Sequence, residues 1–171
     1  MLTNQGKGSA LDLQWEVGGP EAPDPRTSRA SLPGCVTVRE ICDDDLDQVM
    51  ALWHASGVAR PWNEPATDIA FARRGPHSTI LVAEMQARIV ASAMVGEDGH
   101  RGWVYYVAAA PEYQGAGLGK GIMAAAENWL RQRGVWKVQL LVRNGNERAR
   151  QFYEHLGYRD TSSVCLQKVI G

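Results

Sequence analysis

The chain has 171 residues, which is enough for one domain with a hydrophobic core. Its 18 lysines and arginines almost balance its 19 aspartates and glutamates, so no basic stripe predicts nucleic-acid binding. No apolar run is long enough to span a membrane, and the first residues lack the pattern of a secretory signal. The three cysteines show no CxxC spacing, and the four histidines show no ligand spacing. We therefore expect a cytoplasmic protein with reduced thiols, no metal, and neither nucleic acid nor a membrane as partner.

Residues 1–34 differ in composition from the rest of the chain. The stretch VGGPEAPDPRTSRASLPG is rich in proline, glycine and small polar residues and has no periodic apolar pattern. We expect residues 1–34 to form a flexible N-terminal extension, with room for a short ordered piece around Leu11 to Val17. The folded domain is expected at residues 35–171.

Strands and helices alternate from Cys35 onward. The pattern predicts a strand in CVTVREI, then a helix in DLDQVMALWHAS with Asp43 or Asp44 as its cap. A loop and a short helix follow in RPWNEPATDIAFARR, and STILVAE and ARIVASAMVGE predict an antiparallel hairpin that turns at residues 85–87. GWVYYVAAA predicts a further strand.

The second half of the chain begins with a helix in LGKGIMAAAENWLRQRG, whose apolar residues fall on one face. A strand in WKVQLLV, a helix from Asn146 to His155 and a last strand from Tyr158 to Val169 complete the prediction. This order of elements predicts an α/β fold with a mixed sheet and helices on both faces.

PEYQGAGLGKG, residues 111–121, places four glycines where the first of these later helices begins. Each glycine costs a helix about 1 kcal/mol relative to alanine. The glycines either leave backbone N–H groups open to an anion or simply form a tight strand-to-helix turn. A P-loop is excluded, because alignment on Gly119–Lys120 puts Gln114 at its first glycine and Gly121 at its hydroxyl position. A dinucleotide fingerprint also fails, since GxGxxG from Gly115 meets Lys120 at its third glycine.

The remaining pattern, Q-x-x-G-x-G within VAAAPEYQGAGLGKGIM, resembles the acyl-CoA-binding motif of the GNAT superfamily of N-acetyltransferases. A second stretch, N-x-x-A-x-x-x-Y-E-x-L-G-Y from Asn146 to Tyr158, resembles the later motif of the same superfamily. The resemblance runs from about Val36 to Val169. RPWNEP and EDGHRG further resemble its YpeA-like bacterial branch. The resemblance implies a mostly antiparallel central sheet that is splayed, often at a β-bulge, at the cofactor cleft.

The same resemblance implies that the chain binds acetyl-CoA. The Val107 amide would face the acetyl carbonyl, and Ala109 would bond the pantetheine arm. Asn146 would cap its helix and also touch that arm, although capping alone is the simpler interpretation. Lys120 would add a charge contact, unless it is merely solvated. The residues implied to hold the pyrophosphate, mostly by main-chain N–H groups, are Gln114, Gly115, Ala116, Gly117, Leu118, Gly119 and Lys120.

Catalytic roles also follow from the resemblance. Tyr153 is the candidate general acid for the leaving thiolate, and its alternative role is that of a core aromatic. Glu97, Asp98 and His100 are candidate bases, although Asp98–Gly99 is equally well a turn. The acceptor side is implied to include Arg60, Trp62, Asn63 and Glu64, where Trp62 would alternatively pin the loop to the core.

The expected function is therefore acetyl transfer from acetyl-CoA to a primary amine by direct attack in a ternary complex, with no metal. The acceptor is a small molecule, an amino acid or a protein amino group. A non-catalytic acyl-CoA-binding or sensing module is the alternative. Homodimers are common in the superfamily, so a second copy of the chain is a candidate partner, and the sequence leaves the oligomeric state open.

Overall fold

The computed structural model describes residues 13–15 and 35–170. This part of the chain falls into two compact units, which divide between Leu140 and Leu141 and are described separately. Within the residues described, no helix is both long and apolar enough to cross a membrane.

The first unit contains a six-stranded sheet whose spatial order follows the chain. Every neighbouring pair is antiparallel except the last, which is parallel. This confirms the predicted mixed, mostly antiparallel sheet. The short strand β1 lies within the ordered piece expected around residues 11–17, and the rest of the predicted extension lies outside the described residues. The strands are β1 (Leu13–Trp15), β2 (Val36–Glu40), β3 (Ser78–Met85), β4 (Arg88–Glu97), β5 (Gly102–Ala109) and β6 (Val138–Leu140).

Strands β3 and β4 form the predicted hairpin. Gln86 and Ala87 are its two turn residues, with φ of 51° and 60°, the backbone that two-residue hairpin turns require. Six of the eight residues of β3 and six of the ten residues of β4 are buried, as their long apolar runs indicate.

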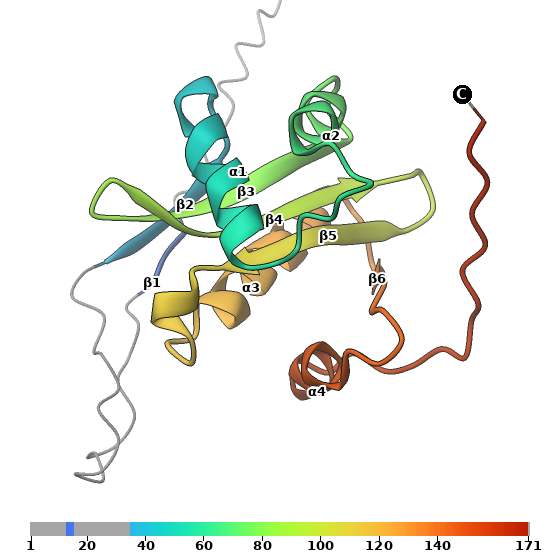
Figure 1. Ribbon diagram of the computed structural model, residues 1–171. Helices are drawn as coiled ribbons and strands as arrows, with labels where there is room; N and C mark the ends of the chain where they lie inside the picture. The colour runs from blue at the N-terminus through green and yellow to red at the C-terminus, as the bar shows by residue number, and fades with distance from the viewer. Residues whose placement is uncertain (1–12, 16–34, 171) are drawn as a thin grey trace, which may run out of the picture. The chain divides into compact units, whose positions relative to one another are not determined.

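Helices cover both faces of this sheet. Helices α1 (Leu46–Ala55) and α2 (Pro65–Ala72) lie on one face, and α3 (Leu118–Arg131) lies on the other (Figure 1). The side of α3 predicted to be apolar is the side that it buries: Leu118, Ile122, Met123, Ala125, Ala126, Trp129 and Leu130. Packing is close at the start of β5, because a Cβ on Gly102 would lie 2.6 Å from Leu130 Cδ1.

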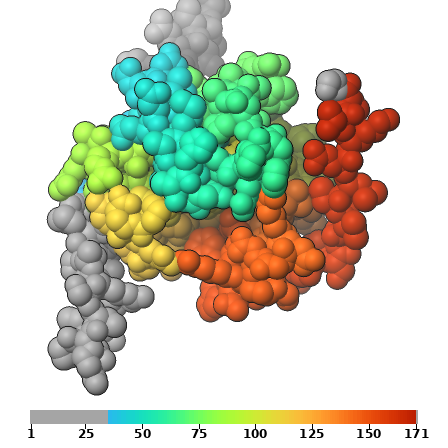
Figure 2. Space-filling view, viewed as in Figure 1, coloured from blue at the N-terminus to red at the C-terminus, as the bar shows by residue number. Residues whose placement is uncertain are grey.

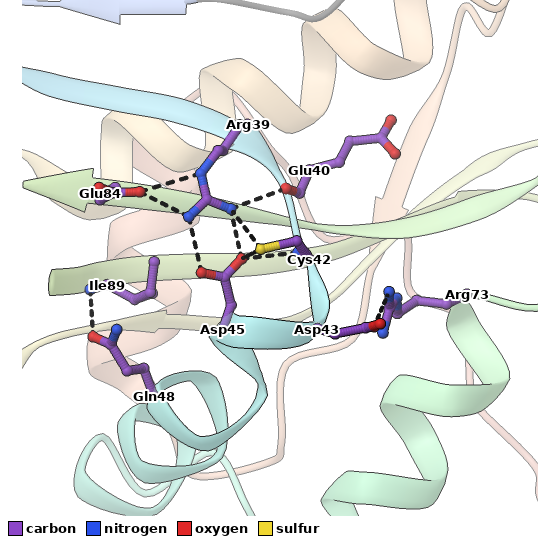
Figure 3. Close-up of polar contacts among 9 residues, drawn as sticks. All are labelled: Arg39, Glu40, Cys42, Asp43, Asp45, Gln48, Arg73, Glu84 and Ile89. Atoms are coloured by element: carbon purple, nitrogen blue, oxygen red, sulfur yellow. Dashed lines mark hydrogen bonds and ion pairs between the residues drawn. The ribbon is translucent and has the colours of Figure 1, made fainter. Parts of the chain in front are cut away.

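The start of α1 differs from the prediction that Asp43 or Asp44 caps it. Asp45 is the buried acidic residue there, and its carboxylate accepts from the Cys42 amide at 2.8 Å. The Arg39 guanidinium binds the same carboxylate and also Glu84 on β3, at 2.7 Å (Figure 3). This ion pairing of Asp45 joins β2, β3 and the start of α1. Asp43 instead pairs with Arg73 at the end of α2.

The second unit contains α4 (Glu147–His155), which begins where it was predicted. The predicted last strand from Tyr158 to Val169 is wrong, because the structure assigns no helix or strand to residues 158–170. Ser162 has φ of 54°, and its amide donates to Asp160 Oδ1 at 2.7 Å, which interrupts an extended backbone. Likewise, only Val138–Leu140 of the predicted strand WKVQLLV is extended.

Candidate active site

The glycine-rich segment connects β5 to α3 through a short 3-10 turn at Pro111–Tyr113. Gly115 has φ of 82°, and Gly117, the residue that precedes α3, has φ of 86°. A residue with a Cβ is strained in this left-handed region, which explains why glycine stands at both positions. Gly119 and Gly121, by contrast, have ordinary helical positions in the first turn of α3.

The first turn of α3 contains backbone N–H groups that have no partner within the helix. The first bond within the helix runs from the Gly121 amide to the Gly117 carbonyl at 2.9 Å, so the amides of residues 118–120 precede it. Among the residues that the structure describes, no side chain caps this end of the helix. Figure 2 shows the yellow segment around residues 111–117 at the surface, not covered by α1 or α2. An anion can therefore reach these amides and the positive end of the helix dipole.

Two of the predicted pyrophosphate-binding residues use their amides within the turn itself. The Gln114 amide donates to the Pro111 carbonyl at 3.2 Å, and the Ala116 amide donates to the Tyr113 carbonyl at 3.1 Å. The main-chain donors for an anion are then those of Gly115, Gly117, Leu118, Gly119 and Lys120. The side chain of Lys120 is exposed.

Strand β5 contains a β-bulge in the middle of its pairing with β4. Met94 pairs with Tyr105 and Ser92 with Ala108, so two residues of β5 lie opposite Ala93 alone. Tyr106, the first residue of the bulge, has φ of 49°, and Val107 is the second. The bulge therefore falls at the residue whose amide was expected at the acetyl carbonyl.

Within the part of the chain that the structure describes, the other edge of β5 is only partly paired. Strand β6 pairs with residues 102–104 of β5 and then ends. The Ala110 amide donates to the Val90 carbonyl on β4 at 2.8 Å, so the preceding Ala109 amide is directed to the opposite edge. Ala109 therefore lies on the part of the β5 edge with which β6 does not pair, while the predicted splay of the sheet at a cofactor cleft stays a prediction.

The segment before α2 is joined to the bulge through the Tyr106 side chain. Asn63 Nδ2 donates to Tyr106 Oη at 2.5 Å, and Tyr106 Oη donates to Asp68 Oδ2 at 2.5 Å. Arg60 and Glu64 of the predicted acceptor side are exposed. Trp62 is 69% exposed, so it does not anchor the loop in the core.

The candidate bases Glu97, Asp98 and His100 lie at the β4–β5 turn. Asp98 Oδ1 accepts from the amides of Arg101 and His100, and Oδ2 accepts from Trp103 Nε1, and these hydrogen bonds lower the pKa of Asp98 to about 2. Contact with His77 lowers the pKa of Glu97.

The three bases are also distant from the bulge along the sheet. This turn meets β5 at Gly102, roughly 16 Å of strand away from Val107. The hydrogen bonds of the Asp98 side chain therefore stabilise the turn, in agreement with the alternative interpretation of Asp98–Gly99. Across residues 13–15 and 35–170, no three His, Cys, Asp or Glu side chains form a group that could hold a metal ion.

Asn146 and Tyr153 both lie in the second unit. Asn146 Oδ1 accepts from the Ala149 amide at 3.1 Å and so caps α4. The rings of Phe152 and Tyr158 make edge contacts with Tyr153, and burial raises the pKa of Tyr153 to about 12. The Tyr153 phenol is therefore a proton donor rather than a phenolate at neutral pH.

Sequence reasoning missed Tyr106 and Asp68. GWVYYV has the pattern of an apolar strand, and no local signal distinguishes one of its tyrosines from the other. Tyr106 differs from Tyr105 because it lies in the bulge. Its ring stacks on that of Trp53 at a centroid distance of 4.1 Å.

Known proteins resemble this chain in sequence and in fold. The family model of the Acetyltransferase (GNAT) family matches residues 40–158. An acetyltransferase of Sodalis glossinidius is 37% identical over 129 residues, which cover 75% of this chain and 91% of the relative. An acetyltransferase of Pectobacterium atrosepticum is 36% identical over 131 residues, 77% of this chain and 93% of the relative.

Solved structures share the fold. The structure of AAC(6')-Iy in complex with the bisubstrate analogue CoA-S-monomethyl-acetylneamine aligns over 80% of this chain and 99% of its own, with a TM-score of 0.69 and 14% identity. A match of the family model over most of the chain, together with relatives above one-third identity along most of their length, shows the relationship. This chain belongs to the GNAT family of acetyltransferases.

Proposed function

We propose that this protein transfers the acetyl group of acetyl-CoA to a primary amine by direct attack in a ternary complex. The observation that carries the proposal is the uncapped N-terminus of α3, reached from β5 through Gly115 and Gly117 at positive φ. Family membership and the complex of AAC(6')-Iy with a CoA bisubstrate analogue support it.

In this proposal the chain holds acetyl-CoA largely with its main chain. The amides of Gly115 and of residues 117–120 bind the pyrophosphate, to which Lys120 adds a positive charge. The partly unpaired edge of β5 receives the pantetheine arm through Ala109, together with Asn146. The Val107 amide stabilises negative charge on the acetyl carbonyl oxygen as the amine attacks.

Tyr153 acts as the general acid. A C–N bond forms between the amine and the carbonyl carbon, the C–S bond breaks, and the Tyr153 phenol gives its proton to the departing thiolate. The Tyr153 phenol is protonated at neutral pH, as a proton donor must be, and its raised pKa makes it a weaker acid than an exposed tyrosine.

The attacking amine must lose a proton, and Glu97, Asp98 and His100 are the proposed bases. The lowered pKa values of Glu97 and Asp98 make both carboxylates weak bases. Since their turn lies roughly 16 Å of strand from Val107, a base among these three residues would act through water.

We propose an amino-sugar acceptor first, because several structural neighbours are named as aminoglycoside acetyltransferases. Arg60, Trp62, Asn63 and Glu64 would line its site. RPWNEP and EDGHRG support placement in the YpeA-like branch. Cytoplasmic location and a homodimer are part of the same proposal, and size-exclusion chromatography with light scattering tests the dimer.

Calorimetric titration with acetyl-CoA tests the donor site, with Gly117→Asp as the decisive variant. The new carboxylate would occupy strained backbone beside the pyrophosphate, so we expect affinity to fall about 100-fold, equal to about 2.8 kcal/mol. Gly134→Asp is the matched control, because Gly134 has φ of 78° and open space around it. It carries the same charge and backbone strain away from the loop. Equal affinity of the two variants would refute the pyrophosphate assignment.

The acceptor is then sought with three probe amines: neamine, spermidine and a peptide with an N-terminal alanine. Acetylated product is detected by mass spectrometry, so that the exposed thiols of Cys35, Cys42 and Cys165 do not interfere with a thiol-based assay. Saturable acetyl-CoA binding without transfer to any amine would favour the non-catalytic sensing module instead.

A further inference from the structure

The backbone of Tyr106 is in a conformation that its side chain disfavours. Its φ of 49° is uncommon for any residue other than glycine and is unusual for a bulky aromatic. Such a conformation persists only where the surroundings determine it, and it is concentrated at functional sites. Three different elements supply those surroundings here.

Stacking is the first of the constraints on Tyr106. Its ring lies nearly parallel to that of Trp53 on α1, with 14° between the planes. Trp53 is itself completely buried, and its Nε1 donates to Ser92 Oγ on β4 at 2.9 Å. Ser92 is one of the two β4 residues that bracket the bulge. The tyrosine ring is thus fixed against α1 at the point where β5 departs from regular pairing.

Hydrogen bonding is the second constraint. The Tyr106 hydroxyl accepts from Asn63 in the segment before α2 and donates to Asp68 on α2, each at 2.5 Å. Asn63 also closes the turn of this segment, because its amide donates to the Arg60 carbonyl at 2.9 Å. One hydroxyl therefore links the strand that carries Val107 to the segment that carries Arg60 and Trp62.

We infer that Tyr106 is a positioning residue: through Asn63 and Asp68 it fixes residues 58–64, the acceptor segment, relative to the bulge in β5. The inference rests on the proposed function, in which this segment lines the acceptor site and the bulge faces the acetyl group. Tyr106 itself contacts neither substrate in this role. It sets the orientation from which an amine held by the acceptor segment approaches the carbonyl carbon, and small errors of orientation are costly in rate.

Tyr106→Phe separates the two constraints, since phenylalanine keeps the stacked ring and removes both hydrogen bonds. Hydrogen exchange of the whole protein, followed by mass spectrometry, measures the effect. We expect exchange in peptides covering residues 58–64 to become at least fivefold faster, with no change in the β3–β4 hairpin. Tyr105→Phe is the matched control, because Tyr105 is 41% exposed and stacks on Trp103 instead. Unchanged exchange in the acceptor segment, or an equal increase throughout the sheet, would overturn the inference.

Variants of Asp68 keep the test decisive even where Tyr106→Phe folds poorly, because Asp68 is only half-buried. Asp68→Asn retains an oxygen that can accept from the phenol, whereas Asp68→Ala does not. We expect faster exchange of the acceptor segment in Asp68→Ala and rescue in Asp68→Asn. Equal behaviour of the two variants would overturn the hydrogen-bonded link.

Kinetics provide a second measurement. With any of the three probe amines that is acetylated, we expect Tyr106→Phe to raise the acceptor KM at least tenfold and to leave the acetyl-CoA Kd within twofold. An unchanged acceptor KM would contradict a positioning role. Failure of the proposed function is seen separately, as loss of acetyl-CoA binding or transfer in the unmodified protein, whereas the exchange experiment needs neither.

Discussion

At the scale of single residues, burial and hydrogen bonding decide at which pH an ionisable side chain gives up its proton. Tyr153 is partly buried between aromatic neighbours, and burial raises its pKa to about 12. A phenol that remains protonated can serve as an acid but not as a base at neutral pH. The opposite holds at the β4–β5 turn, where hydrogen bonds lower the pKa of Asp98 to about 2 and so weaken it as a base.

Tyr153→Phe is therefore expected to lower kcat by about 100-fold or more, the usual contribution of a general acid. The acetyl-CoA Kd should stay within twofold, because the ring is retained. Tyr158→Phe, a neighbour in the same unit, is the control and should leave both values unchanged. The unmodified enzyme should show no alkaline loss of kcat between pH 8 and 10, because the raised pKa keeps the phenol protonated throughout. A kcat that survives Tyr153→Phe would remove the phenol from the mechanism.

At the scale of elements, one guanidinium connects two strands and a helix. Arg39 on β2 pairs with Glu84 on β3 and with Asp45, whose side chain is only 5% exposed, at the start of α1. The Arg39 hydrogen bond is the main reason that the pKa of Asp45 lies far below its usual range. The buried Asp45 carboxylate depends on Arg39 for compensation of its charge, whereas Arg39 is partly exposed and also pairs with Glu84.

Asp45→Asn is expected to reduce the free energy of unfolding by about 2 kcal/mol at pH 7. Because the pKa of Asp45 is lowered on folding, its contribution is present above the unfolded value of about 3.9 and is lost as the pH falls below it. The difference between wild type and variant should therefore shrink from pH 7 to pH 2. Urea unfolding at several pH values measures it, with the exposed neighbour Asp44→Asn as control. A difference that is independent of pH would show that shape, not charge, matters at this position.

At the scale of the whole molecule, local patterns predicted most of the fold, and contacts distant in sequence account for what they missed. Helix α3 could be predicted from the spacing of its apolar residues, and the β3–β4 hairpin from its two apolar runs and the short turn between them. Both signals lie within a short stretch of sequence. The role of Tyr106 was not, since it depends on Asn63, 43 residues away, and the Arg39–Glu84 pair spans 45 residues. The last strand was predicted wrongly because alternation describes a strand only where a neighbouring strand is available to pair with it.

Binding of the donor should also stabilise the molecule as a whole. A ligand that binds only the folded state at 100 times its Kd adds about 2.7 kcal/mol to the free energy of unfolding. In a chain of this length each kcal/mol raises Tm by about 2–4 °C, so we expect acetyl-CoA to raise Tm by about 5–10 °C. Scanning calorimetry measures the shift.

Acetyl-pantetheine at the same concentration is the informative comparison, because it has the thioester and lacks the pyrophosphate. If the amides at the start of α3 supply the dominant contacts, acetyl-pantetheine should raise Tm by no more than about 1 °C, since little of it binds below its own Kd. Gly117→Asp should lose the acetyl-CoA shift, and Gly134→Asp should keep it. Equal shifts with the two ligands would place the binding energy along the edge of β5 instead, where Ala109 and the bulge would then be the main contacts of the donor.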